Sequence, residues 1–252
     1  MSLRLVPSLL ATAAFLVQVS HPAYGQSSGS SAPGTEKDET KLETPASPEL
    51  QKLLGEAQEL QGRHRYFDAL AKLEDAERIA PKDPNVYNIR GAIYLVPAVR
   101  EFDKAKENFE KALALEPTAL APKFNLAELE FVKHTFADAE TAFSSILKNY
   151  PKLQMPVRHL VAFKILVSES MQGKASEAQE TLKTFFTFMD DTPAYYFSKA
   201  TLAFAAKNEK EANEWLEKAK AIFKAPENAP YLDSMMEARL IPNIMLPPAE
   251  AK

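Results

Sequence analysis

Residues 84–117, PNVYNIRGAIYLVPAVREFDKAKENFEKALALEP, decide the fold. In this stretch Ala105, Phe109 and Ala112 fall on one face of a predicted helix, in the order small, large, small. The same order, or a close variant of it, recurs four more times, at Ala69/Leu73/Ala76, Ala139/Phe143/Ile146, Ala178/Leu182/Phe185 and Ala212/Leu216/Ala219. The leading alanines are 36, 34, 39 and 34 residues apart. Such a period indicates a stacked array of helical pairs, in which each pair buries its apolar face against its neighbours.

The first pair shows how one unit begins and ends. Ser47 is suited to cap a helix, and Pro48 to occupy its first position. A break at residues 62–65 separates this helix from a second one, which we expect from Tyr66 to Ile79, before Pro81. Helix, short turn, helix and a terminating proline then recur in the next two units.

The second unit resembles the tetratricopeptide repeat. That family's pattern has an aromatic residue, a glycine, a tyrosine, then alanine, an aromatic residue, alanine and proline. Here these positions are Tyr87, Gly91, Tyr94, Ala105, Phe109, Ala112 and Pro117. The third unit matches nearly as well, the first and fifth keep mainly their second half, and the fourth is the weakest. The resemblance covers residues 48–224 and implies an all-α, right-handed α-solenoid of about five helix pairs within residues 47–224.

A further helix is predicted at residues 225–241, where apolar residues recur at helical spacing. We expect it to cap the last repeat, docked through Tyr231, Leu232, Met235 and Met236. The alternative is that the methionine pair forms an adaptable binding surface. Residues 242–252 contain Pro-Pro and no periodicity, so we expect an extended or disordered tail.

The N-terminus has the features of an export signal. Residues 1–25 combine Arg4, an apolar stretch from Leu5 to Val19, and Ala23-Tyr24-Gly25 before Gln26, where we expect cleavage. An uncleaved membrane anchor is the alternative, but the apolar stretch is shorter than the roughly 20 residues of a spanning helix. The prediction is therefore an exported protein, periplasmic or secreted, without an integral anchor after cleavage. The absence of cysteine favours a bacterial periplasm over an animal extracellular space.

Residues 26–46 contain one large aliphatic residue and no aromatic residue. A segment of this kind buries too little apolar surface to fold, so we expect a disordered tether. A docking peptide within it is the alternative.

Composition and motifs argue against several classes of function. The net charge of −4, with acidic and basic residues interspersed, gives no footprint for nucleic acid. No phosphate loop, serine elbow or zinc-protease motif is present. We interpret His64, His134 and His159, which lie in three different repeats, as solvated surface or turn residues rather than metal ligands. Asp190-Asp191 is interpreted as a turn. The sequence thus predicts no enzyme, no cofactor and no metal.

The resemblance implies that a groove lined by the first helices of successive repeats binds a protein or peptide partner. A groove with phenylalanine and a few polar groups suits a peptide with apolar anchors. The inward positions carried over from the family are Asn88, Ala92, Leu95, Phe124, Glu128, Phe131, Arg158, Phe197, Thr201 and Phe204. Some of these phenylalanines could instead pack against adjacent helices. The family's carboxylate clamp is absent, since the corresponding positions are Leu54, Gln58, Ile89, Ala121 and Asn125.

The sequence therefore predicts a non-catalytic interaction scaffold or adaptor that acts outside the cytoplasm. Two alternatives stay open. One is an accessory factor of an envelope-assembly or secretion complex, and the other is a self-associating structural protein, which would form homo-oligomers.

Overall fold

The structure is a computed structural model that describes residues 47–241. Within this range the chain forms eleven α-helices and no strand, which confirms the predicted all-α solenoid. The predicted signal peptide (1–25), tether (26–46) and tail (242–252) lie outside the described residues. The helices are α2 (Pro48–Gly62), α3 (Tyr66–Ile79), α4 (Pro84–Leu95), α5 (Phe102–Leu115), α6 (Leu120–Val132), α7 (Phe136–Asn149), α8 (Met155–Met171), α9 (Ala175–Phe185), α10 (Ala194–Ala205), α11 (Glu209–Ile222) and α12 (Ala225–Glu237).

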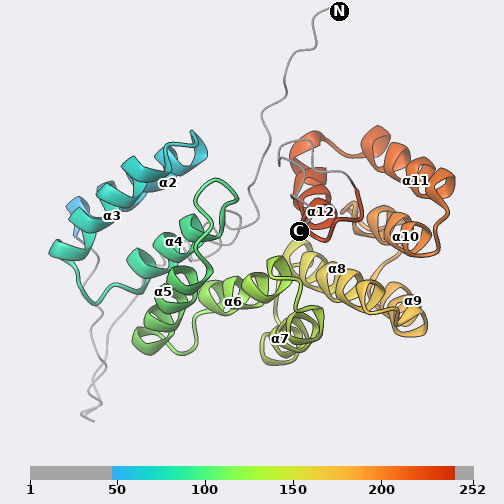
Figure 1. The fold of residues 1–252 in the computed structure, drawn as a ribbon, viewed down its shortest axis with the longest axis horizontal. Coiled ribbons are helices and arrows are strands. Elements are labelled where there is room, and N and C mark those ends of the chain that lie inside the picture. The colour runs from blue at the N-terminus through green and yellow to red at the C-terminus, as the bar shows by residue number, and fades with distance from the viewer. Residues whose placement is uncertain (1–46, 242–252) are drawn as a thin grey trace, which may run out of the picture.

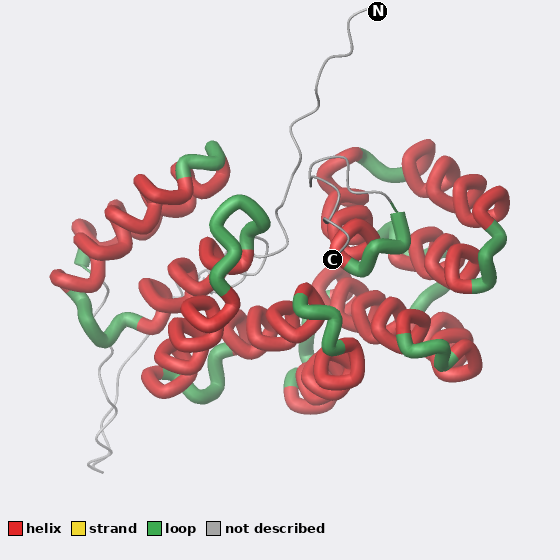
Figure 2. Tube along the Cα trace, in the orientation of Figure 1, coloured by secondary structure: helices red, strands yellow, loops and turns green. Residues whose placement is uncertain are grey.

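Successive helices pair as α2/α3, α4/α5, α6/α7, α8/α9 and α10/α11, and the pairs stack side by side. The array bends into an arc, with α12 on its inner side (Figures 1 and 2). Ser47 begins the first helix as expected, because its hydroxyl accepts a hydrogen bond from the backbone N–H of Leu50 at 3.1 Å.

The alanines of the repeated pattern lie where paired helices meet. Ala69, Ala105, Ala139, Ala178 and Ala212, the leading alanines, are all fully buried. The pair α4/α5 shows how little room there is, since a methyl group added to Gly91 would stand 2.5 Å from a ring carbon of Phe109. Small residues at these positions therefore allow the close approach of the two helices that buries the large residue beside them.

The apolar core is divided into three clusters along the array. One joins α2, α3 and the start of the second repeat, and a small one lies between the second and third repeats. The largest extends from α6 to α12 and includes most of α8, whose buried residues run from Val157 to Glu169 with one exception, Arg158. The C-terminal half is therefore the better packed part of the described chain.

The turns inside four of the five helix pairs share one backbone conformation. His64, His134, Gly173 and Lys207 each follow a first helix and adopt a left-handed conformation, with φ between 59° and 75°. Placing His64 and His134 in turns is therefore correct. His159 is different, because it lies on α8 with 6% of its surface exposed. The expectation that it is a solvated residue is wrong, since Thr192 provides the buried partner that its ring needs.

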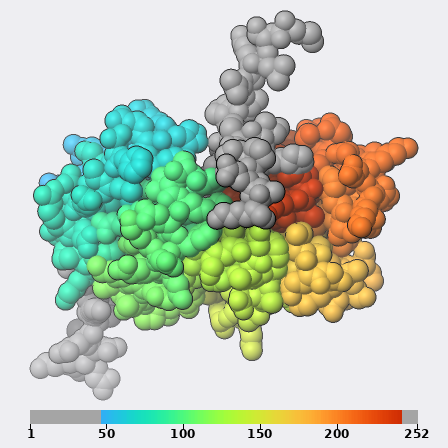
Figure 3. Space-filling view, viewed as in Figure 1, coloured from blue at the N-terminus to red at the C-terminus, as the bar shows by residue number. Residues whose placement is uncertain are grey.

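The predicted C-terminal helix is present as α12, but it ends at Glu237 and its position differs from the expected one. It packs on α8 and α10, the first helices of the fourth and fifth repeats, more than on α11, the last helix of the array. In the space-filling view its red surface lies between the orange surface of α11 and the yellow surface of α8 (Figure 3). The helix covers the inner face of the last two repeats rather than only the end of the stack.

Candidate functional site

The inner face of the arc is formed by the first helices of the repeats, and the ten residues predicted to line a groove lie on these helices (Figure 1). Two of the ten are accessible, since Arg158 is exposed and Phe204 is half-buried. The other eight are buried, namely Asn88, Ala92, Leu95, Phe124, Glu128, Phe131, Phe197 and Thr201. Their role in peptide binding stays a prediction, and as the chain is folded these eight side chains offer almost no surface to a ligand.

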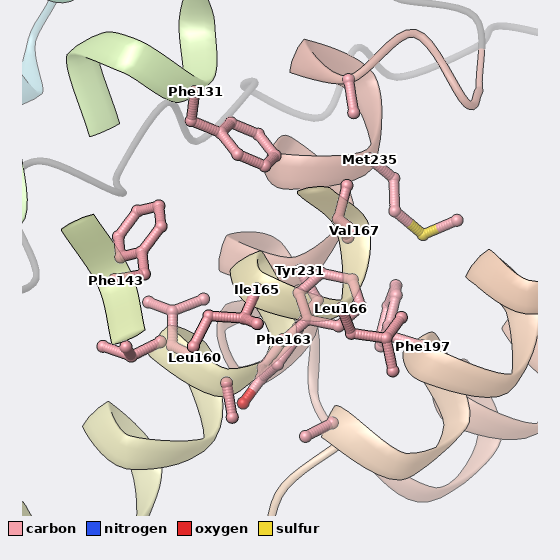
Figure 4. Packing of buried hydrophobic residues seen from close by; sticks show 14 of the residues in the cluster. Phe131, Phe143, Leu160, Phe163, Ile165, Leu166, Val167, Phe197, Tyr231 and Met235 are labelled. Atoms are coloured by element: carbon pink, nitrogen blue, oxygen red, sulfur yellow. The ribbon is translucent and has the colours of Figure 1, made fainter. Parts of the chain in front are cut away.

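The phenylalanines among them belong to the core. The ring of Phe124 meets that of Phe143 edge to face at 5.4 Å, and Phe131 meets Phe136 in the same way at 5.6 Å. Both therefore pack against the second helix of their own repeat. Figure 4 shows Phe131 and Phe143 among the residues of this cluster.

Polar contacts between neighbouring first helices lie among these aromatic residues. Asn125 on α6 donates its side-chain N–H to the Oδ1 atom of Asn88 on α4 at 2.8 Å. One repeat further, the ammonium of Lys164 on α8 lies 2.7 Å from a carboxylate oxygen of Glu128 on α6. Both side chains of this ion pair are almost completely buried, and the ammonium also lies 4.4 Å from the ring centre of Phe131. These pairs connect successive repeats by hydrogen bonds that form only when the two first helices are correctly aligned along their length.

On the C-terminal half of the inner face, α12 covers α8 and α10. Tyr231 inserts its ring between Phe163 and Phe197, at centroid distances of 5.1 Å and 5.4 Å (Figure 4). Burial raises the pKa of the Tyr231 phenol, although its hydrogen bond with Thr192 opposes the shift. Met235 is fully buried one turn further along α12. Docking through these two residues agrees with the prediction for the C-terminal helix, whereas Leu232 and Met236 are only partly buried.

The C-terminal end of α12 reaches the second and third repeats. Arg100, in the loop between α4 and α5, donates a hydrogen bond to the Glu237 carboxylate at 2.8 Å. His134, in the turn between α6 and α7, contacts the backbone carbonyl of Glu237 through Nε2 at 2.7 Å. Cationic and N–H groups stabilise the carbonyl end of a helix, so these two turns hold α12 at the end where its dipole is negative.

The N-terminal half of the inner face has no described helix over it. A hollow of about 340 Å³ opens where α4 and α6 begin. Asn85 and Asn88 line it from α4, Ala121 lines it from α6, and Tyr150 closes it from the third repeat. It combines amide groups with apolar surface, which is the mixture that extended peptides contact.

The loop between α9 and α10 contacts α12 through Thr192. His159 is hydrogen-bonded through Nδ1 to the hydroxyl of Thr192 at 2.7 Å, and Thr192 in turn contacts Tyr231. Burial lowers the pKa of His159, while the nearby Asp190 opposes the shift and Arg158 reinforces it. The carboxylate of Asp190 also accepts a hydrogen bond from the backbone N–H of Thr187 at 2.7 Å, in agreement with the predicted turn.

Residues 47–241 contain no group of three or more histidine, aspartate or glutamate side chains arranged to hold a metal ion. Among the helices of the same range, none has the length and apolar character that a membrane span requires.

The comparison with known families agrees with this architecture. Residues 98–153 match the tetratricopeptide repeat. A tetratricopeptide repeat protein from Parabacteroides merdae superposes with a TM-score of 0.57 at 16% identity, over 74% of this chain and 71% of that one. A thermophilic tetratricopeptide repeat protein of Thermus thermophilus gives 0.56 at 20% identity, over 76% and 100%. PilW, described as a widely conserved type IV pilus biogenesis factor, gives 0.58 at 19% identity, over 77% and 90%. In sequence, no curated protein matches the chain significantly. At these identities the likenesses show a shared tetratricopeptide-repeat fold.

Several residues of the site were not found from the sequence. Lys164 carried a usable signal, because it is the one charge within the apolar run LVAFKILV at residues 160–167. A charge in such a run is stable only with a buried partner. Arg100 and Glu237 carried no such signal, because they are 137 residues apart and only the curvature of the array brings them together.

Proposed function

We propose that this protein is an exported, non-catalytic scaffold that binds a segment of another protein on the inner face of its tetratricopeptide-repeat array. Arrays of this fold present an extended concave surface to protein partners. The observation that carries the proposal is the hollow at the start of the first helices α4 and α6, which no described helix covers.

The chemistry of the hollow fits an extended peptide. The exposed amide group of Asn85 can both donate and accept hydrogen bonds, as a peptide backbone requires. Leu120, Ala121 and Pro122 supply apolar surface for a side chain of the peptide. This position replaces the phenylalanine-lined groove as the proposed contact surface, because Phe124 and Phe131 are fully buried.

Export is supported by the sequence of residues 1–25. The test is expression of the full chain in a bacterium, followed by fractionation and N-terminal sequencing. We expect a mature protein that begins at Gln26 in the periplasmic fraction. A chain that keeps Met1 and sediments with membranes would instead support an anchored protein.

Partner binding is tested by crosslinking and co-purification from native cells, with the parent beside an Asn85→Arg/Ala121→Arg variant. Two long cations in the hollow block a peptide. Asn85 is exposed, but Ala121 is partly buried against the core, so circular dichroism of the variant checks that the fold is kept. The matched control is Asn213→Arg/Ala221→Arg, which makes the same two changes at exposed positions of α11. Partners lost from the first variant and kept by the control support the proposal, whereas partners kept by both place binding elsewhere.

The similarity in fold to PilW keeps the accessory-factor alternative open. In that case the captured partners would be subunits of a membrane-bound complex. For the self-association alternative, the parent would capture copies of itself, and its mass in solution would rise with concentration.

A further inference from the structure

The helix α12 sits on the inner face as a ligand helix would sit in a groove. It follows a short connector, Phe223-Lys224, whose backbone is extended with ψ near 150° at both residues. Its anchors Tyr231 and Met235 are one turn apart, the spacing with which amphipathic helices bind grooves. A helix that belonged to a sixth repeat would stack on the fifth repeat, whereas α12 also packs on α8 of the fourth repeat.

The sequence of α12, APENAPYLDSMME, does not favour a helix by itself. It has a proline inside the helix at Pro230, and asparagine, aspartate and serine are weak helix formers. Isolated helices of this length are marginal in water even with good formers. The helical state of α12 therefore depends on docking, and its release would be a transition from order to disorder.

Unsatisfied polar groups weaken the packing around α12. The Oδ1 atom of Asn228, on α12, is buried without a hydrogen-bond partner. On α10, one of the two helices beneath it, the hydroxyls of Ser198 and Thr201 are in the same situation. Each buried polar group of this kind costs free energy.

The ion pair between Arg100 and the Glu237 carboxylate, which we call the latch, opposes release of α12, and His134 adds a contact with the Glu237 carbonyl. Both contacts hold only the last residue of α12, and they come from turns of the second and third repeats rather than from the helices that α12 covers. The Arg100 side chain is 22% exposed and that of Glu237 is 9% exposed, so the ion pair is partly shielded yet open to competition from solvent.

We propose that the face of α8 and α10 is a helix-binding site, that α12 is its exchangeable occupant, and that the Arg100–Glu237 latch controls the exchange. The ligand is an amphipathic helix of a partner protein with the pattern of α12. That pattern is an aromatic anchor, an apolar anchor four residues later and a carboxylate two residues beyond it. This inference does not rest on the proposed function, because it concerns another part of the inner face.

The experiment uses the full chain as the parent, as Glu237→Arg, and as the charge-reversed pair Arg100→Glu/Glu237→Arg. Glu217→Arg on α11 is the control, because it breaks an exposed ion pair with Lys220. Hydrogen exchange follows the amides of α12, α8 and α11. Fluorescence anisotropy follows the binding of a labelled peptide with the sequence of residues 223–241.

In Glu237→Arg we expect the amides of α12 to exchange about tenfold faster or more, with α8 and α11 unchanged, and the peptide to bind. In the charge-reversed pair both effects should return toward the parent, and the control should resemble the parent throughout.

Three results would overturn the inference. In the first, α12 exchanges together with α8 in every variant, which makes α12 a fixed part of the core. In the second, α12 opens but the peptide does not bind. In the third, the mass of Glu237→Arg doubles, which assigns the face to α12 of a second copy rather than to a partner protein.

Discussion

Gly91 faces the ring of Phe109 across the interface between α4 and α5, and this contact fixes how closely the two helices approach. Alanine at this position would place a methyl group 2.5 Å from a fully buried ring that has no room to move. We therefore expect Gly91→Ala to lower the free energy of unfolding by about 1–3 kcal/mol through overpacking. Urea unfolding followed by circular dichroism measures the change.

Gly55 in α2 is the matched control, because a methyl group there meets nothing within 4 Å. Gly55→Ala should raise stability by about 0.5–1 kcal/mol, since alanine is the better helix former. The same substitution thus has opposite signs at two helical glycines. Equal effects would show that helix propensity, and not the contact with Phe109, decides the outcome.

The buried pair Lys164–Glu128 leads to the second prediction at this scale. Lys164→Ala leaves the carboxylate of Glu128 buried without its partner, and we expect a loss of about 3–5 kcal/mol. The double variant Lys164→Met/Glu128→Leu removes both charges and should be within about 1 kcal/mol of the parent, or more stable. A small loss for Lys164→Ala in chemical unfolding would mean that water reaches this carboxylate.

At the scale of the element, the left-handed residue after the first helix recurs in four of the five pairs. Lys207 adopts φ 60° there, which is unfavourable for a residue with a side chain, whereas Gly173 adopts φ 75° without strain. Lys207→Gly should raise stability by about 1 kcal/mol, and Gly173→Ala should lower it by a similar amount. Thermal unfolding of both variants tests this, and a loss in Lys207→Gly would contradict it.

The contact between α8 and the α9–α10 loop makes stability depend on pH through His159. Burial lowers the pKa of His159 below its ordinary value of 6.5, so below that pH the unfolded chain binds a proton that the folded chain resists. We expect the stability of the parent to fall as the pH drops through about 6.5. In His159→Gln this part of the decrease should be absent. Urea midpoints of the parent and of His159→Gln, measured above and below this pH, test the prediction. If the two midpoints change with pH in parallel, the decrease does not come from His159.

The elements themselves could be largely predicted from the sequence. The second helix was expected from Tyr66 to Ile79 and lies at those residues, because an interhelical break and a proline mark its ends. Local signals of this kind do not determine where an element packs. The position of α12 depends on the curvature of ten preceding helices, and the burial of Phe124 depends on which face of α6 meets α7. For that reason the helices could be predicted from the sequence, whereas the burial of individual residues such as Phe124 could not.

For the whole molecule, the division of the core determines how the chain unfolds. In stacked arrays each repeat is stabilised by its neighbours, so a weak end can open by itself. The first repeat has only one neighbour and a small cluster around Leu73. The C-terminal half shares one large cluster around Phe163, which α12 also joins. The described chain should therefore lose its first repeat before its last three.

The single tryptophan, Trp215 on α11, reports on the C-terminal half, while circular dichroism reports on all helices. Leu73→Ala removes contacts worth about 2–5 kcal/mol from the cluster that holds the first repeat on α4. It should produce an early loss of helix signal and leave the urea midpoint of Trp215 fluorescence unchanged. Phe163→Ala removes about 3–5 kcal/mol from the shared cluster and should lower the fluorescence midpoint itself. If Leu73→Ala lowers both midpoints equally, the array unfolds as one cooperative unit, and the contacts between its three clusters are stronger than their separation implies.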